Sequence, residues 1–135
     1  MQILIVDNDT SWTRYAAEVL ENEGHHVEII ADNKKAYAKI RNTKFDLILY
    51  DIKAFKVARK VLCQLMLKQV INRLIVAAAL PNYKDAMDVK WLGASDYIDK
   101  TYNNNEIINV INKNIHTIPL NRVYLKKRLK EAKCI

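Results

Sequence analysis

Hydrophobic and polar positions follow two alternating patterns along the chain. Short, nearly continuous apolar runs rich in leucine and β-branched residues are typical of strands covered on both faces in a parallel sheet. Such runs predict strands at residues 2–6, 26–30, 45–51, 73–78 and 95–98. The segments between them place apolar residues three or four positions apart, as on one face of a helix. Because single helices joining successive strands require right-handed crossovers, we expect an α/β fold with a doubly wound, five-stranded parallel sheet.

The helices are predicted from these apolar faces and from capping residues. The first is predicted by Trp12, Tyr15, Ala16, Val19 and Leu20. Thr10 or Ser11 can cap its start, and Gly24 can follow its end in a left-handed conformation. The later helices are predicted by Ala36 and Ile40; by Val57, Val61, Leu62 and Leu65; by Ala86 and Val89, ending at Gly93; and by Ile107, Ile108, Ile111 and Ile115. The polar run at residues 103–105 is interpreted as a loop and helix cap.

Composition limits the chain to one folded unit. It has 135 residues, of which 50% are apolar, and this is close to the usual size of a single domain. No apolar run approaches the ~20 residues of a membrane span, and no leader pattern is present at the N-terminus, so we expect a cytoplasmic protein. Cys63 and Cys134 lie far apart in sequence without a CxxC spacing, and we interpret them as two reduced thiols.

The net charge of +7 is spread unevenly, with +5 in residues 120–135 and +2 in residues 1–119. We therefore divide the chain into a domain at residues 1–118 and a basic tail at residues 119–135 that begins with Pro119. Leu120, Val123, Tyr124 and Leu129 give the tail roughly helical apolar spacing. Two interpretations remain open: a basic amphipathic helix that docks on a partner, an anionic surface or nucleic acid, or a solvated extension of the last helix.

Polar residues gather at the predicted strand ends. Asp7, Asn8 and Asp9 follow the first strand, Asp51 ends the third, and Lys100 follows the fifth. In a doubly wound sheet, ligands bind at the carboxyl ends of the strands. Clustered carboxylate and amide oxygens repel one another unless a hard cation such as Mg2+ neutralises them. A carboxylate beside Mg2+ and an ammonium group can attack a phosphoryl donor, although each aspartate alone could simply cap a helix or end a strand.

The motifs ILIVDND, FDLILYDI and LGASDYIDKTY make the chain similar to the receiver domains of two-component response regulators over roughly residues 1–116. The resemblance implies a flavodoxin-like (βα)5 fold and a signalling domain that is not an enzyme. It implies that Asp51 is the phosphoacceptor and that Lys100 is the invariant-type catalytic lysine of the family. It also implies that Mg2+ is held by Asp7, Asn8, Asp51 and the backbone carbonyl of Lys53. The implied partners are a histidine kinase or phosphotransfer protein, a downstream protein target and a possible second copy of the chain.

The chain also departs from the family pattern. Asn8 stands at an acidic position, so we expect weaker Mg2+ binding. Ala78 stands where the switch hydroxyl is usual, which puts in doubt the link between phosphorylation and movement of Tyr97. Phe55 and Thr101 stand at positions where proline is usual, and the stretch between Asp51 and Ala78 is a few residues short.

Two further residues bear on the chemistry of the site. Lys53 places a cation two positions after Asp51, where it could neutralise charge or simply be a solvated loop lysine. Leu80 could shield the site from a hydrolytic water, which would give a long-lived phosphoryl group.

Three classes of function follow. The first is a stand-alone phosphoacceptor that signals by protein contacts through its fourth helix, fifth strand and fifth helix, and this class is favoured by Asp7, Asp51 and Lys100. The second is a pseudo-receiver that works as an interaction module without phosphorylation, which Asn8 and Ala78 favour. The third, least favoured, is a nucleic-acid-associated regulator that acts through the tail.

Overall fold

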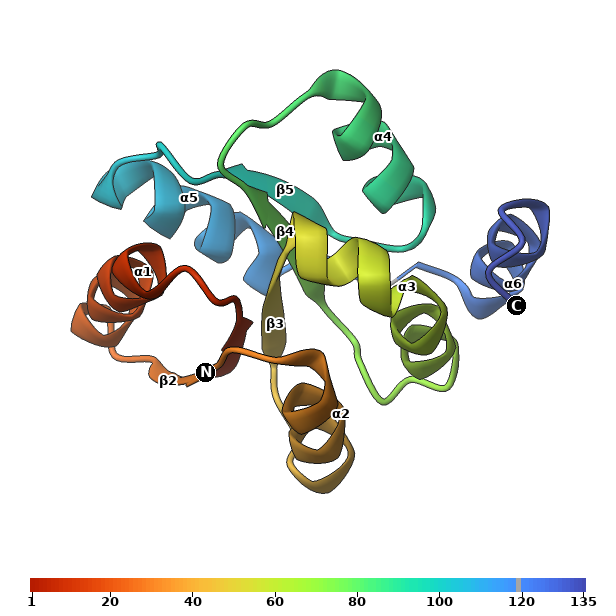
Figure 1. Ribbon diagram of the computed structural model, residues 1–135, viewed down its shortest axis with the longest axis horizontal. Coiled ribbons are helices and arrows are strands. Elements are labelled where there is room, and N and C mark those ends of the chain that lie inside the picture. The colour runs from red at the N-terminus through yellow and green to blue at the C-terminus, as the bar shows by residue number, and fades with distance from the viewer. Residues whose placement is uncertain (119) are drawn as a thin grey trace.

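A computed structural model of the protein describes residues 1–118 and 120–135, and shows one parallel sheet with helices on both sides (Figure 1). The strands are β1 (Gln2–Val6), β2 (His26–Ile30), β3 (Leu47–Asp51), β4 (Leu74–Ala78) and β5 (Asp96–Asp99). The helices are α1 (Thr10–Asn22), α2 (Asn33–Asn42), α3 (Ile52–Leu67), α4 (Tyr83–Trp91), α5 (Asn104–Ile115) and α6 (Arg122–Glu131). The strand order β2-β1-β3-β4-β5 confirms the doubly wound, five-stranded fold.

The sheet separates two apolar cores. On one side, α1 and α5 bury residues such as Trp12, Ala16 and Ile107 against the sheet. On the other side, α2, α3, α4 and α6 pack around Tyr50 and Phe55, both at most 1% exposed. Strands buried on both faces explain the continuous apolar runs of the sequence, most clearly at β1, β3 and β4.

Most predicted element ends agree with the structure to within two residues. Gly24 and Gly93 have φ angles of +91° and +106°, as a left-handed residue after a helix requires. Asn103 caps α5 in a capping box with Glu106. The cap of α1 is Asp9 rather than Thr10 or Ser11, because the Asp9 carboxylate accepts from the backbone N–H of Trp12 at 3.2 Å.

Helix α3 begins directly after β3, with no loop between Asp51 and Ile52. This accounts for the short stretch that the sequence showed after Asp51. The buried face of α3 runs through Phe55, Ala58 and Leu62. Val57, which we had placed on that face, is 83% exposed because it lies outside this three-to-four-residue spacing.

The C-terminal segment forms a separate helix, α6, which packs beside α3 (Figure 1). The interpretation as a solvated extension of the last helix is therefore wrong. Leu125 and Leu129 are buried at 5% and 0% exposure, whereas Val123 and Tyr124 are 77% and 66% exposed. The predicted apolar stripe was thus right at Leu129 but wrong at Val123 and Tyr124, since the buried stripe follows the i, i+4 pair of leucines. Pro119, where we placed the start of the tail, lies outside the described residues.

Two cysteines meet where α6 packs on α3. Cys63 of α3 and Cys134, just after α6, are both free and fully buried in the same core. Burial and the neighbouring Cys134 thiol raise the pKa of Cys63 to about 12. The prediction of reduced thiols agrees with two free cysteines, but their spacing along the chain did not indicate that the two thiols would be neighbours.

In the described part of the chain, no helix is both long enough and apolar enough to span a bilayer.

Candidate functional site

Three side chains predicted at strand ends meet at the carboxyl edge of the sheet. Asp7 follows β1, Asp51 ends β3, and Lys100 follows β5. The Lys100 ammonium nitrogen (Nζ) lies 2.7 Å from Asp7 Oδ2 and 3.0 Å from Asp51 Oδ1. Asp9 Oδ2 lies further out, at 3.9 Å from the same nitrogen. One cation therefore bridges two carboxylates from strands that are adjacent in the sheet but distant in the sequence.

This ion cluster is largely withdrawn from water. The side chains of Asp7, Lys100 and Asp51 are 1%, 8% and 12% exposed. Burial raises the pKa of Asp7, although its hydrogen bond with Lys100 and the backbone N–H of Asp9 partly oppose this. Burial alone would lower the pKa of Lys100, but hydrogen bonds to Asp7 and Asp51 outweigh it and raise that pKa. Lys100 therefore remains an ammonium group that can neutralise charge at Asp51.

Trp12 also contacts the cluster, and sequence reasoning missed this role. The Lys100 ammonium nitrogen lies 5.1 Å from the centroid of the indole ring, within the range of a cation–π contact. We had assigned Trp12 only to the apolar face of α1. Its place in the first turn after Asp9, beside the carboxyl edge of the sheet, was the available signal.

Asp51 is at once the last residue of β3 and the N-cap of α3. Its Oδ2 accepts from the backbone N–H groups of Lys53 and Ala54 at 3.1 and 3.3 Å. Its Oδ1 faces Lys100. Both carboxylate oxygens therefore already have donors, one from a side chain and one from the helix backbone.

A hollow of about 330 Å³ lies beside the carboxylate of Asp51. Its walls include Asn8, Lys53 and Asp32, the N-cap of α2, which sequence reasoning had not included. The donor types fit Mg2+, which uses one or two carboxylates with other oxygens and water. Among residues 1–118 and 120–135, no three Asp, Glu, His or Cys side chains converge as a metal-binding group. Any such site therefore depends on few carboxylates, with an amide and water beside them.

The Lys53 carbonyl, predicted as a further metal ligand, belongs to the first turn of α3. Carbonyl groups in an α-helix point toward its C-terminal end, whereas Asp51 caps the N-terminal end. The role of the Lys53 carbonyl as a metal ligand, like the roles of Asp7, Asn8 and Asp51, stays a prediction. The Lys53 side chain is exposed.

The two residues predicted as switch positions, Ala78 and Tyr97, lie on β4 and β5. Ala78 is 1% exposed, and its carbonyl accepts from the Lys100 N–H at 2.9 Å. Its methyl side chain cannot donate a hydrogen bond, as expected from the sequence. Tyr97 is half-buried, and its burial raises the pKa of its phenol, partly offset by the backbone of Asn82. Leu80 is 89% exposed, and its role in shielding Asp51 stays a prediction.

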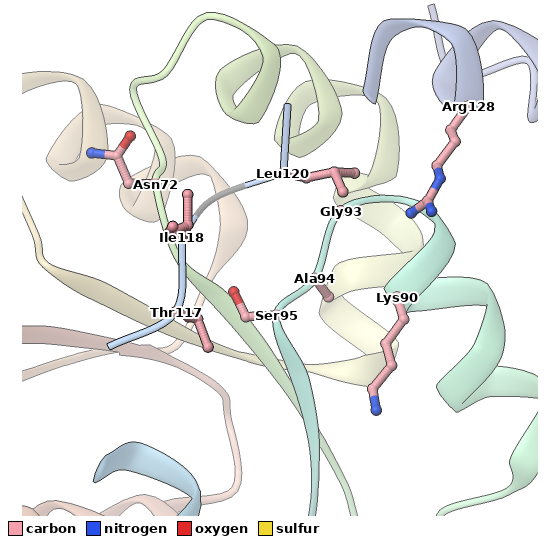
Figure 2. A pocket seen from close by; sticks show the side chains of 9 residues that line it. All are labelled: Asn72, Lys90, Gly93, Ala94, Ser95, Thr117, Ile118, Leu120 and Arg128. Carbon is pink, nitrogen blue, oxygen red and sulfur yellow. The ribbon is translucent and has the colours of Figure 1, made fainter. Parts of the chain in front are cut away.

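A second pocket, of about 340 Å³, lies at the opposite end of the sheet beside α6 (Figure 2). Lys90 of α4 and Arg128 of α6 border it, together with the turn from Gly93 to Ser95. The Arg128 guanidinium also stacks on Trp91, with its central carbon 4.6 Å from the ring centroid. This pocket exists because α6 packs back on the domain, which the sequence did not predict.

Comparison with known proteins shows the family of the chain. The model of the response regulator receiver domain matches residues 3–112. Response regulator ArlR of Staphylococcus saprophyticus is 27% identical over 107 residues, covering 79% of this chain and 49% of that protein. The probable transcriptional regulator ycf29 of Porphyra purpurea is 28% identical over 131 residues, covering 93% of this chain and 62% of that protein. The chain thus spans only about half to three fifths of the length of these relatives.

Solved structures share the fold. A response regulator from Thermotoga maritima superposes with a TM-score of 0.78 at 19% identity, covering 86% of this chain and 98% of that one. The BeF3-activated N-terminal receiver domain of Klebsiella pneumoniae RstA gives a TM-score of 0.71 at 19% identity, covering 87% and 100%. Since the family model matches most of the sequence and the sheet order is that of the fold, this chain belongs to the response regulator receiver family of two-component signalling.

Proposed function

We propose that this chain accepts a phosphoryl group on Asp51 from a histidine kinase or phosphotransfer protein and signals by protein contacts. The observation that carries the proposal is the Lys100 ammonium group at 2.7 Å from Asp7 and 3.0 Å from Asp51. A buried lysine between two carboxylates has a direct use in phosphoryl transfer, where negative charge develops on the transferring oxygens.

The chemistry follows from the two oxygens of Asp51. One carboxylate oxygen forms a bond to phosphorus while the bond from phosphorus to the donor histidine nitrogen breaks. The product is an acyl phosphate, and the released imidazole takes up a proton. Lys100 stabilises the added charge through its ammonium group, and Trp12 helps to hold that group beside the site.

Mg2+ would supply further charge neutralisation when bound, and Asp7, Asn8 and Asp51 are the residues that would hold it. Asn8 contributes a neutral oxygen where a carboxylate would bind more strongly. We therefore expect a requirement for higher Mg2+ concentrations than a site with an additional carboxylate would need.

The contact surface for a downstream protein lies on α4 in this proposal. Tyr83, Met87 and Trp91 recur every four residues along α4 and are 80%, 54% and 45% exposed. Exposed aromatic and methionine side chains in one stripe are typical of protein contact sites.

The proposal is tested by incubating the protein with Mg2+ and a small phosphodonor such as acetyl phosphate, and measuring intact mass. We expect a gain of one phosphoryl group that is absent in Asp51→Ala and from reactions without Mg2+. Lys100→Arg serves as the matched variant, since it keeps the charge but not the compact ammonium, and it should react more slowly. A mass gain that persists in Asp51→Ala would show a different acceptor.

A second candidate, a pseudo-receiver that is not phosphorylated in normal function, is favoured by the capping role of Asp51. Its carboxylate already accepts from two backbone N–H groups and from Lys100, so it stabilises α3 without any phosphate. Beryllofluoride with Mg2+ distinguishes the two candidates. A rise in melting temperature that Asp51→Ala abolishes supports the receiver, and no change at high Mg2+ supports the pseudo-receiver.

A further inference from the structure

Positive and negative charges are separated along the chain more completely than the net charge of +2 over residues 1–119 suggests. Residues 1–32 contain one basic and seven acidic side chains, and residues 33–73 contain eleven basic and two acidic ones. The net charge of +2 that we assigned to residues 1–119 is thus the balance of two strongly charged segments. The basic segment contains α2 and α3, the two helices that follow one another along one side of the sheet.

Helix α6 adds to the same side. The lysine and arginine residues of α2, α3 and α6, which we call the basic face, number thirteen, and Glu131 is the one acidic residue in these three helices. All three helices pack into the core that contains Tyr50 and Phe55, whereas α1 and α5 cover the opposite side of the sheet. Figure 1 shows α2, α3 and α6 in succession around that side.

Most of these cations are unneutralised. Among the described residues, Lys39 and Lys56 are the members of the basic face with a carboxylate within 4.0 Å, namely Glu28 and Asp85. Lys34, Lys35 and Arg41 of α2, Lys53, Arg59 and Lys60 of α3, and Arg122, Lys126, Lys127 and Lys130 of α6 are exposed. Such concentrated charge repels itself, and the repulsion is relieved when a polyanion binds.

We propose that the basic face binds the phosphodiester backbone of duplex nucleic acid without reading its sequence. Helix α3, with 16 residues, extends about 24 Å. A duplex presents one negative charge per ~1.7 Å of its axis. The length of α3 alone therefore matches on the order of ten phosphates, which is enough to use cations from several turns and from the neighbouring helices.

The composition of the face favours a duplex over other anionic partners. Protein interface cores are depleted of lysine, which dominates here. Helices that bind membrane surfaces present Trp, Phe or Leu beside their cations, whereas the most exposed apolar residues on these three helices are Val57, Val123 and Tyr124. Single-strand binding uses several aromatic platforms, and Tyr124 is the one strongly exposed aromatic residue among the described parts of these helices.

The inference goes beyond the proposed phosphoacceptor function and does not depend on it. It also differs from the hypothesis of DNA binding by the tail alone, because eight of the thirteen cations lie on α2 and α3. Removal of α6 should therefore weaken binding rather than abolish it.

The first experiment measures fluorescence anisotropy of a labelled random-sequence duplex, with the full chain, across a series of salt concentrations. We expect micromolar binding at low salt, equal for unrelated sequences, with a log–log salt slope steeper than about −4. Duplex DNA, duplex RNA and single-stranded DNA of equal length serve as parallel probes. Vesicles rich in anionic lipid and polyglutamate test the membrane and acidic protein alternatives.

The second experiment compares two triple variants that lower the net charge equally. Lys35→Glu, Lys60→Glu and Lys127→Glu remove one cation from each helix of the basic face. Arg14→Glu, Lys84→Glu and Lys113→Glu remove exposed cations from α1, α4 and α5. We expect the first variant to bind at least tenfold more weakly with a salt slope smaller by about 3, and the control to bind much closer to wild type. Thermal unfolding of both variants shows whether the fold is kept.

Two results would overturn the inference outright. The first is that the wild-type protein does not bind duplexes at low salt. The second is an equal loss of duplex affinity in the two triple variants, which would show an effect of net charge only. Tighter binding to vesicles or to polyglutamate than to duplexes would replace the nucleic acid by that partner. Phosphoryl uptake, measured on the same variants, reports separately on the proposed receiver function.

Discussion

The two ends of α3 are held by different kinds of interaction. At its N-terminal end, the Asp51 carboxylate caps the helix and is paired with Lys100 in a buried cluster of charges. At its C-terminal end, Leu62, Cys63 and Met66 lie in an apolar core together with Leu125 and Leu129 of α6. The first end can respond to pH and ions, whereas the second depends on packing that neither pH nor salt changes much.

The charged interactions of α3 thus lie at its N-terminal end, and the apolar packing that stabilises it lies at its C-terminal end. Ionisable groups that are buried together depend on their partners, so loss of one partner is costly there. Apolar packing is insensitive to charge but sensitive to volume. Variants at each end therefore have distinguishable signatures, and the following predictions use them.

The largest effect is expected at the charged end, from Lys100→Met. This variant keeps the approximate volume of the side chain but leaves the buried carboxylates of Asp7 and Asp51 without a cation. We expect a loss of about 4 kcal/mol in the free energy of unfolding at pH 7. The loss should shrink on acidification, because burial raises the pKa of Asp7 and a protonated Asp7 no longer needs the ammonium group. Urea unfolding at several pH values measures it, and a loss independent of pH would mean that packing, not charge, was removed.

The next largest effect is expected at the apolar end, from Leu129→Ala. Leu129 is fully buried, so its truncation should cost about 3 kcal/mol at any pH between 5 and 8. Val123→Ala in the same helix is the control, because Val123 is 77% exposed and its truncation should change stability by less than about 0.5 kcal/mol. Similar effects of the two substitutions would show that α6 does not pack on α3 in solution.

A smaller effect separates the capping role of Asp51 from its charge. Asparagine caps a helix about as well as aspartate does, and alanine does not. We expect Asp51→Ala to be less stable than Asp51→Asn by about 1 kcal/mol in thermal or urea unfolding. Equal stability of the two variants would contradict the capping role.

The smallest effect concerns Asp7. Because burial raises its pKa in the folded state, the folded protein takes up a proton more readily than the unfolded chain. Asp7 therefore contributes stability that is complete below its ordinary pKa near 3.8 and is lost as pH rises through the folded pKa. Asp7→Asn should remove this component, so its stability relative to wild type should rise with pH. A relative stability that falls with pH would show that Lys100 dominates Asp7.

Much of the fold followed from the sequence because buried parallel strands are continuous apolar runs. The starts of β1 and β2 were predicted to the residue. Val57 was misplaced because Phe55, Ala58 and Leu62 form the buried face of α3, and Val57 lies outside their spacing. The packing of α6 was missed because Leu125 stands among lysines and arginines, and only the position of α3 makes its burial beside Leu129 favourable.

The sequence predicted those parts of the site in which the end of a strand determines where a side chain lies. Asp7, Asp51 and Lys100 met because the carboxyl ends of parallel strands share one edge of the sheet. The contact of Trp12 with Lys100, and of Cys63 with Cys134, depends on side-chain placement across the fold, which spacing along the chain does not determine. The basic face was hidden for a related reason, because a sum of charges over a long segment discards the side on which they lie.

Because β3 passes directly into α3, the single carboxylate of Asp51 both ends the strand and caps the helix. Where a loop separates a strand from the next helix, that loop can absorb a change in the bonding of the strand's last residue. Here the two N–H groups at the head of a sixteen-residue helix bond to Asp51 itself. Any change at that carboxylate therefore acts directly on the start of α3, and the other end of α3 packs against α6.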